Sequence, residues 1–243
     1  MCYHGDARPP LAPVRAGVAS GGDMVMRSVD GSYFTAHFAH PDIPSATGVV
    51  ILPDGRGLHD FYRDLAHRFA EAGHHAVAID YFGRSAGTTA RADDFDFRDH
   101  VAQMEPADVD GDVAAAAAWL GRAATTAVTV GFGLGGALSW RQSAANPALS
   151  GCVGFYGTPD HARDAIPRMR APVLLLAAGQ DQTPVSEVEA FAADVRAAGT
   201  KADLHVYPDA PHGFFDRHFD DDYEGECADA WRRILEFIEA RRD

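Results

Sequence analysis

Two residues in the C-terminal half of the chain, Asp181 and His212, have the types and the placement of an acid–base pair. Asp181 comes just after the apolar residues 173–179, and His212 follows the strand-like residues 202–207 and the turn residues 208–211. Loops at the carboxyl ends of strands in an open α/β sheet carry ligand-binding and catalytic groups. We therefore expect the carboxylate and the imidazole to meet at the edge of the sheet, as candidates for the acid and the base of a hydrolytic triad.

Gly133 occupies the position at which such a pair would be joined by a nucleophile. Residues 128–130 have the composition of a strand, and the glycines at 131, 133, 135 and 136 form a tight turn into a helix. A Gly-x-nucleophile-x-Gly turn presents Ser or Cys on a strained backbone, and the acid and the base follow it in the order found here. Because glycine has no side chain, the sequence predicts either a slow reaction in which water is the nucleophile or an inactivated site.

The same glycines also satisfy a dinucleotide-binding fingerprint. Gly131-x-Gly133-x-x-Gly136 follows a strand and opens a helix, and Asp160 lies further on at roughly the 20-residue spacing of that fingerprint. In dinucleotide-binding domains the fingerprint normally lies in the first strand–helix unit. Here a hairpin and two strand–helix units precede it, so dinucleotide binding stays an alternative.

The elements that position these residues are predicted by hydrophobic periodicity and turn signals. Residues 24–29 and 33–40 alternate in polarity around Asp30-Gly31, which predicts a β-hairpin. Strands and helices then alternate, which predicts an α/β fold with a mostly parallel sheet, helices on both faces and no separate cap domain. Further strands are expected at residues 48–52, 75–80 and 151–155 and around Val173, and helices at residues 61–72, 107–120, 135–144 and 226–241.

Two finer expectations concern the ends of elements and domains. The helix after Asp181 is expected to begin at a capping box formed by Ser186 and Glu189. Residues 1–22 are rich in Pro, Gly and Ala without periodicity, so we expect them to form a loose N-terminal arm. Residues 23–243 are expected to form a single domain, since this length and composition suit one core.

The composition excludes several classes of partner. The 243 residues carry a formal net charge of −14, which opposes binding to nucleic acid or to an anionic membrane surface. No apolar run approaches the roughly 18 residues of a membrane-spanning helix, and no signal peptide is recognised. We expect a soluble cytoplasmic protein that acts on a small molecule without a cofactor.

No metal site is expected either. The acidic residues within 93–99 and 216–222 lack the spacing of a calcium loop, and we expect them to lie on solvated faces. The three cysteines, Cys2, Cys152 and Cys227, are widely spread and lack metal-binding spacing, so we expect them to be reduced and structural.

Four segments together resemble the dienelactone hydrolase family of α/β hydrolases. They are VVILPDGRG at 49–57, AIDYFGR at 78–84, the glycine turn GFGLGG at 131–136 and PHGFF at 211–215, and the resemblance extends from about residue 24 to residue 237. Members of that family hydrolyse small cyclic or linear esters with a Cys in the turn, an Asp and a His. The resemblance implies that Asp181 orients His212, that His212 is the base or acid, and that the thiolate's position falls on Gly133.

The resemblance also implies a substrate pocket. Asp54 occupies the place of an acidic residue that interacts with the nucleophile in the family. Arg84 and Arg217 correspond to arginines that hold a substrate carboxylate, a task suited to a planar guanidinium. Tyr81 lies in the same matched segment as Arg84 and is a further candidate substrate-binding residue.

The backbone N–H groups of Gly55 and Leu134 would form an oxyanion hole according to the same resemblance. Three functions stay open from the sequence. The first is a hydrolase of a small ester or lactone, with or without a carboxylate, that lacks its nucleophile and is either water-mediated or inactivated. The second is a lyase, isomerase or cyclase that uses His212 for proton transfer. The third is a catalytically silent protein that binds a small ligand.

Overall fold

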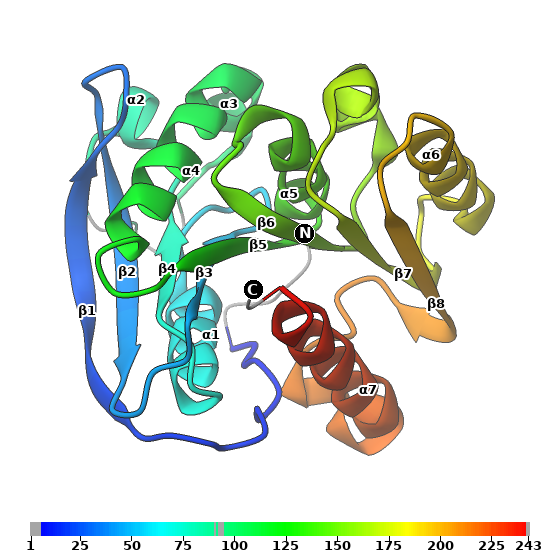
Figure 1. Ribbon diagram of the computed structural model, residues 1–243, viewed down its shortest axis with the longest axis horizontal. Coiled ribbons are helices and arrows are strands. Elements are labelled where there is room, and N and C mark those ends of the chain that lie inside the picture. The colour runs from blue at the N-terminus through cyan, green and yellow to red at the C-terminus, as the bar shows by residue number, and fades with distance from the viewer. Residues whose placement is uncertain (1–5, 90, 92–94, 242–243) are drawn as a thin grey trace.

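The computed structural model describes residues 6–89, 91 and 95–241, which form one eight-stranded sheet with helices on both faces (Figure 1). The strand order is β1-β2-β4-β3-β5-β6-β7-β8. Strands β3 to β8 run parallel, whereas β1 pairs with β2 and β2 with β4 in antiparallel fashion. The predicted α/β fold with an N-terminal hairpin is therefore confirmed. The strands are β1 (Val18–Arg27), β2 (Tyr33–Pro41), β3 (Thr47–Leu52), β4 (Ala76–Ile79), β5 (Thr126–Phe132), β6 (Leu149–Phe155), β7 (Val173–Gln180) and β8 (Ala202–Pro211).

The hairpin forms at the expected turn. The backbone N–H of Ser28 donates to the carbonyl of Ser32 over 2.9 Å. Gly31 has a φ of 90°, a left-handed conformation that glycine adopts without a Cβ clash. Pairing continues as far as Val18, which lies opposite Pro41. β1 thus begins inside the segment 1–22. Residues 18–22 pair through their backbone, but they show no alternation of polarity, so the sequence pattern does not predict that they belong to a strand.

The parallel strands are buried on both faces, which explains their continuous apolar sequences. Successive side chains of a strand point to opposite faces, so Val49 and Ile51 pack toward α1 and α7, whereas Val50 and Leu52 pack toward α4, α5 and α6. Figure 1 shows the sheet separating these two groups of helices. The helices are α1 (Asp60–Glu71), α2 (Gly83–Ala86), α3 (Arg98–Ala102), α4 (Pro106–Leu120), α5 (Leu134–Ala145), α6 (Val185–Ala197) and α7 (Asp220–Glu239), with 3-10 turns η1 (Pro159–His161), η2 (Arg163–Arg168) and η3 (Arg217–Phe219).

Three helical features differ from the expectations. α6 begins at Val185 after Pro184 and no side chain caps it, so the expected capping box is wrong. α7 begins at Asp220 and is kinked at Tyr223, and the regular apolar periodicity that predicted a start near residue 226 lies beyond this kink. The helices α2 and α3 have four and five residues, which is too short for periodicity to reveal them.

The segment before β1 packs on the rest of the chain. The N–H of Arg8 donates to Oδ1 of Asp216 over 3.0 Å, and the indole N–H of Trp231 donates to the carbonyl of Pro10 over 3.3 Å. Ala7 is buried. Asp216 is also buried, in contrast to the expected solvated face, because its carboxylate receives this backbone N–H from a segment 208 residues away in the chain.

Candidate functional site

Asp181 and His212 form a hydrogen-bonded pair beyond the carboxyl ends of β7 and β8. The Nδ1–H of His212 donates to Oδ2 of Asp181 over 2.9 Å. Oδ1 of Asp181 accepts the backbone N–H of Gln182 over 2.6 Å, which holds the carboxylate in place. The side chain of Asp181 is 7% exposed and that of His212 is 31% exposed. Because Nδ1 is bound to the carboxylate, an acid–base reaction of this imidazole would use Nε2.

The residues after His212 determine where the imidazole lies. Gly213 has a φ of 80°, so the chain turns immediately after the histidine at a position that suits glycine. Phe214 and Phe215 are fully buried, and both rings pack on Phe155 at the end of β6. In this segment, His212 therefore lies at the edge of the sheet, and the two phenylalanines that follow it fix the loop by packing in the core.

Gly133 forms the turn between β5 and α5. Its φ of 54° and ψ of −116° lie in a region that residues with a Cβ occupy only at a cost of about 1–3 kcal/mol. The N–H of Gly133 donates to the carbonyl of Phe155 over 3.0 Å, and its own carbonyl accepts the N–H of Gly136 over 3.0 Å. The turn thus has a strained backbone conformation that glycine adopts at little cost.

The neighbouring glycines have a packing function. A Cβ added to Gly131 would collide with the carbonyl of Gly135, and one added to Gly136 would collide with the carbonyl of Phe155. A Cβ added to Gly135 would collide with the carbonyls of residues 52 and 53 at the end of β3. Close approach of α5 to the sheet therefore accounts for these three glycines.

The backbone donors expected for an oxyanion hole lie on neighbouring loops. Leu134 is the first residue of α5, and the N–H groups of a first helical turn have no acceptor within the helix. Gly55 lies in the loop after β3, and β3 is the direct neighbour of β5 in the sheet. The phenol of Tyr81 donates to the carbonyl of Pro53 over 2.7 Å and so braces the start of this loop.

Asp54 is a second carboxylate at the same sheet edge and is 1% exposed. Oδ1 of Asp54 accepts the N–H of Arg56 over 3.0 Å, and Nε2 of His59 lies 3.6 Å from the same oxygen. Burial acts to raise the pKa of Asp54, but His59 and the Arg56 N–H outweigh it and hold this pKa below its usual value. The Asp54 carboxylate is therefore ionised at neutral pH.

A row of aromatic rings joins the Asp54 loop to the His212 loop. The N–H of Asp54 donates to the phenolic oxygen of Tyr62 over 2.8 Å, and the Tyr62 ring lies 5.8 Å from that of Phe132. Phe132 lies 6.3 Å from Tyr156, whose ring lies 4.8 Å from the His212 imidazole. Tyr156 has a φ of 35°, which is rare for a residue with a side chain and is found mostly at functional sites.

The sequence reasoning missed Tyr156. The available signal was its place directly after β6, the strand between the elbow strand and the strand that leads to Asp181. A residue at that strand end belongs to the same loop cluster.

Comparison with known proteins relates this geometry to a family. A model of the dienelactone hydrolase family matches residues 34–241. This chain belongs to the dienelactone hydrolase family. It is 31% identical to a Salmonella typhi protein provisionally named a carboxymethylenebutenolidase, over 96% of this chain and 93% of that protein. It is 26% identical to the carboxymethylenebutenolidase of Rhodococcus opacus, over 83% of this chain and 84% of that protein.

Solved structures agree with this family. A Klebsiella pneumoniae protein provisionally described as a dienelactone hydrolase has a TM-score of 0.74 and 27% identity, covering 90% of this chain and 99% of that one. The dienelactone hydrolase-like promiscuous phosphotriesterase P91, from metagenomic libraries, has a TM-score of 0.70 and 18% identity, covering 92% of this chain and 99% of its own. At that identity P91 shares the fold.

Arg84, one of the two arginines expected from the family resemblance, is held in an ion pair. Its Nη1 and Nη2 donate to the two carboxylate oxygens of Asp112 over 2.8 and 2.9 Å. Nη2 also donates to Oγ of Ser28 over 3.0 Å, and Nε donates to Asp30 over 3.0 Å. Asp112 raises the pKa of Arg84 above its ordinary value. The guanidinium therefore links the hairpin to α4.

Arg217 lies in η3, shortly after the dyad histidine. Its side chain is exposed, and its backbone N–H donates to the carbonyl of Arg8 over 2.8 Å. The contact places the N-terminal segment next to the loop that carries His212.

Neither cysteine of the described residues lies in the turn at Gly133. Cys152 and Cys227 are both buried, in β6 and α7. Burial raises the pKa of Cys152 to about 12, so this thiol stays protonated and unreactive at neutral pH. The thiol of Cys227 donates to the carbonyl of Phe214 over 3.3 Å. Cys2 lies outside the described residues, as do Asp93 and Asp94.

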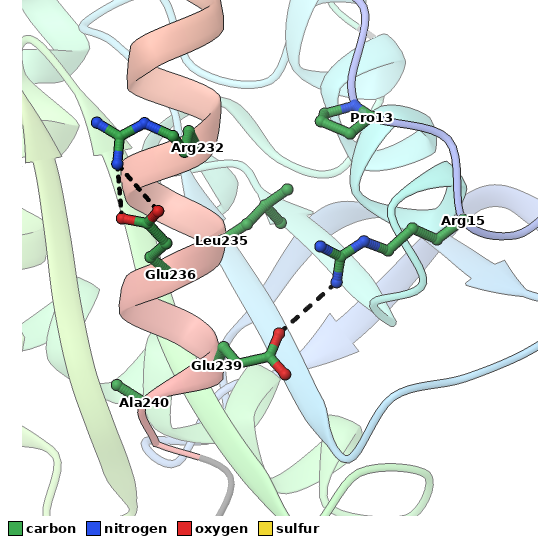
Figure 2. A pocket seen from close by; sticks show the side chains of 7 residues that line it. All are labelled: Pro13, Arg15, Arg232, Leu235, Glu236, Glu239 and Ala240. Atoms are coloured by element: carbon green, nitrogen blue, oxygen red, sulfur yellow. Dashed lines mark hydrogen bonds and ion pairs between the residues drawn. The ribbon is translucent and has the colours of Figure 1, made fainter.

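A cavity of about 540 Å³ lies between the N-terminal segment and α7, and its lining comes from residues 13–15 and 232–240 (Figure 2). Figure 2 shows Leu235 projecting from α7 between two ion pairs. Arg15 lies 3.6 Å from Glu239, and Arg232 lies 2.8 Å from Glu236. Phe237, in the same part of α7, packs beside Gly151 near the start of β6, so this cavity lies toward the sheet edge opposite the dyad.

Across residues 6–89, 91 and 95–241, no cluster of three or more His, Cys, Asp or Glu side chains has an arrangement that could hold a metal ion. Within the same ranges, no helix combines the length and the apolar character that crossing a membrane requires.

Proposed function

We propose that this member of the dienelactone hydrolase family hydrolyses a small ester or lactone with water in place of a side-chain nucleophile. The observation that carries the proposal is the 2.9 Å hydrogen bond between His212 and Asp181 beside an elbow whose central residue is Gly133. The acid–base pair is retained, and the missing nucleophile side chain leaves room for a water molecule beside it.

In this reaction Nε2 of His212 removes a proton from the water as its oxygen bonds to the carbonyl carbon of the substrate. The carbonyl electron pair moves to the oxygen, which the N–H groups of Leu134 and Gly55 stabilise. The tetrahedral intermediate then expels the alkoxide, which takes the proton back from His212. Asp181 orients the imidazole and stabilises its charged form.

The reaction should be slow. In a protease with a dismantled triad, binding and the oxyanion hole alone left activity about 10³–10⁴ above the uncatalysed rate. A retained acid–base pair is expected to add to such a residual rate, because general base catalysis contributes roughly 10²–10⁴-fold.

Asp54 and Tyr81 support the site without entering the proton transfer in this proposal. The ionised Asp54 contributes negative charge next to the elbow, and Tyr81 braces the loop that carries Gly55. We do not propose that Arg84 binds a substrate carboxylate, because its guanidinium already donates to both carboxylate oxygens of Asp112. Arg217, whose exposed side chain lies in η3, stays a candidate substrate-binding residue through the family resemblance.

Proton-transfer chemistry without hydrolysis is the second candidate, and the same retained pair without a nucleophile favours it. A lyase or isomerase would use His212 for proton transfer and the backbone donors for an enolate. Dinucleotide binding has weaker support, because close packing of α5 already accounts for Gly131, Gly135 and Gly136.

The test is hydrolysis of phenyl acetate and of an unsaturated lactone by the purified chain in ¹⁸O-labelled water, with intact-protein mass spectrometry during turnover. We expect acid product that carries the label, together with protein of unchanged mass at every time point. Acylated protein would contradict water as the nucleophile, and product formation at the rate of buffer alone would contradict hydrolysis.

A further inference from the structure

A cavity of about 320 Å³ lies beside the elbow on the face covered by α4 and α5. Val101 of α3, Met104 of the connection that follows and Pro106 at the start of α4 contribute one wall. Leu134 and Leu138 contribute a second wall from the first turns of α5. These five side chains are apolar, so most of the surface near the elbow offers a substrate no charged partner.

The cavity adjoins both backbone donors that the proposed reaction uses. Leu134, which lines the cavity, directly follows Gly133. A Cβ added to Gly55 would lie 3.8 Å from the ring of Phe97 and 4.0 Å from Val101, so the loop after β3 lies against α3. A substrate carbonyl at these donors would therefore have one arm within reach of the cavity.

The other residues that line the cavity are Arg141, Asp160, His161 and Asp164. Arg141 and the two aspartates are already paired with other charged groups. Nη1 of Arg141 donates to both carboxylate oxygens of Asp164 over 2.7 and 2.9 Å, and Nε of Arg141 lies 3.7 Å from Asp110. Arg141 holds the pKa of Asp164 below its ordinary value, so this carboxylate stays ionised. Asp160 is a second acid on the rim and pairs with Arg163 over 3.0 Å. A substrate carboxylate here would have to displace Asp164 from Arg141 and would face two acidic neighbours.

The geometry points to this cavity as the binding site for an uncharged apolar arm of an ester, an alkyl chain or a phenyl ring, rather than for a carboxylate. The inference rests on the proposed function, because it places that arm next to the reacting carbonyl. The size is adequate, since an apolar cavity of about 150 Å³ accommodates benzene. The site thus favours neutral esters over the carboxylate-bearing substrates expected from the family resemblance.

A binding experiment tests the cavity without requiring turnover. The chain has five methionines, of which Met104 lines the cavity. The methionine methyl groups are labelled with ¹³C and observed by NMR, and the Met104→Leu variant assigns the Met104 signal. Phenylacetamide serves as an uncharged, stable ester analogue, and succinamate as a charged one. We expect a saturable shift of the Met104 signal with phenylacetamide, no shift with succinamate at equal concentration, and a constant signal from the buried Met169. An unmoved Met104 with phenylacetamide, or a larger response to succinamate, would overturn the inference.

A kinetic experiment links the cavity to the reaction. In the Gly133→Cys background, kcat/KM for p-nitrophenyl butyrate is compared with that for p-nitrophenyl acetate and p-nitrophenyl hemisuccinate. We expect butyrate to exceed hemisuccinate at least tenfold, and Val101→Trp to lower the butyrate-to-acetate ratio about tenfold by filling the cavity. The control Val25→Trp changes an exposed residue of β1 and leaves the ratio as it is. Faster cleavage of hemisuccinate would contradict the inference.

The two experiments separate failure of the cavity from failure of the function. If the unsubstituted chain hydrolyses phenyl acetate only at the rate of buffer while Met104 responds to phenylacetamide, the proposed hydrolysis fails and the apolar binding site stands. If the unsubstituted chain hydrolyses phenyl acetate, but Met104 stays unmoved and the Gly133→Cys variant cleaves the three esters without discrimination, the hydrolase function stands and the assigned cavity is wrong.

Discussion

In the proposed site, Gly133 contributes a strained turn but no reactive side chain. The turn is present, with a φ of 54° and hydrogen bonds to Phe155 and Gly136 on either side. Asp181 and His212 are joined as well, because the carboxylate accepts the Nδ1–H of the imidazole. At the scale of residues, the proposed chemistry therefore depends on the imidazole rather than on a covalent intermediate.

Replacing His212 by alanine tests that dependence. We expect His212→Ala to lower the residual kcat for phenyl acetate by roughly 10²–10⁴-fold, the usual contribution of a general base. A matched control is His205→Ala, which removes another histidine of the same region of the chain, one whose Nε2 lies 3.5 Å from Asp229. Equal rates for the two variants in a stopped assay would show that the imidazole does not catalyse the reaction.

Tyr156 is expected to position the imidazole through ring contact. Tyr156→Ala removes the ring that lies 4.8 Å from His212, so we expect kcat to fall about tenfold while KM stays within a factor of two. Tyr156→Phe keeps the ring and should keep most of the rate. Initial-rate kinetics on the three proteins measure this, and a Phe variant as slow as the Ala variant would assign the effect to the hydroxyl instead.

At the scale of elements, the functional residues lie on loops whose positions follow from the order of strands. The hairpin, the alternation of strands and helices, and the strand ends that precede Asp181 and His212 were predictable because each depends on a local pattern. The hydrogen bond between Asp181 and His212 follows from β7 and β8 being neighbours, which the chain order suggests for a parallel sheet.

Contacts between distant elements were not predictable in this way. The motif that contains Arg84 predicts a residue of the substrate pocket. Its partner Asp112 lies 28 residues away on α4, and the sequence around Asp112 does not indicate that this carboxylate is buried. The strained backbone of Tyr156 and the apolar cavity beside Leu134 likewise arise from packing between elements, and no periodicity within one element encodes them.

The Arg84–Asp112 pair should stabilise the junction of the hairpin with α4. Burial raises the pKa of Asp112 while the guanidinium of Arg84 opposes this, and the Asp112 side chain is 1% exposed. We expect Asp112→Ala to lower the free energy of unfolding by about 3–5 kcal/mol, since it leaves Arg84 without its buried partner. Asp30→Ala, which removes a 47% exposed partner of the same arginine, should lower the free energy of unfolding much less, because solvent screens an exposed ion pair. Urea unfolding measures both, and equal losses would refute the distinction.

At the scale of the whole molecule, one sheet edge gathers Asp54, Gly133, Asp181 and His212 from four separate loops. The N-terminal segment crosses to this region, where the carbonyl of Arg8 accepts the N–H of Arg217. The formal net charge of −14 leaves the molecule strongly acidic. Neutral substrates are therefore favoured by the whole molecule as well as by the cavity, because a net negative charge repels anions.

Acid stability should depend on a histidine pair at the antiparallel side of the sheet. The Nδ1 atoms of His40 and His75 lie 2.6 Å apart, and burial lowers the pKa of both below 6.5. Below that value the unfolded chain takes up protons that the folded chain does not. Stability is therefore complete above about pH 6.5 and decreases as the pH falls toward the folded pKa values. We expect His40→Phe, which retains an aromatic ring against Trp119, to flatten this decrease in urea unfolding at pH 7.5 and 5.5. An unchanged pH dependence would assign the acid sensitivity to other groups.

The most direct measurement for the central claim is turnover of phenyl acetate by the chain and by its Gly133→Cys variant, with intact-protein mass spectrometry alongside. A site that lacks only its nucleophile should gain roughly 10²-fold or more in hydrolysis and should accumulate one acetyl group on the protein. The variant should also lose about 1–3 kcal/mol of stability, because a Cβ enters the strained turn. A folded variant that retains the His212–Asp181 hydrogen bond by NMR, yet stays inert and unacetylated, would contradict the claim that this is a hydrolase site missing one side chain.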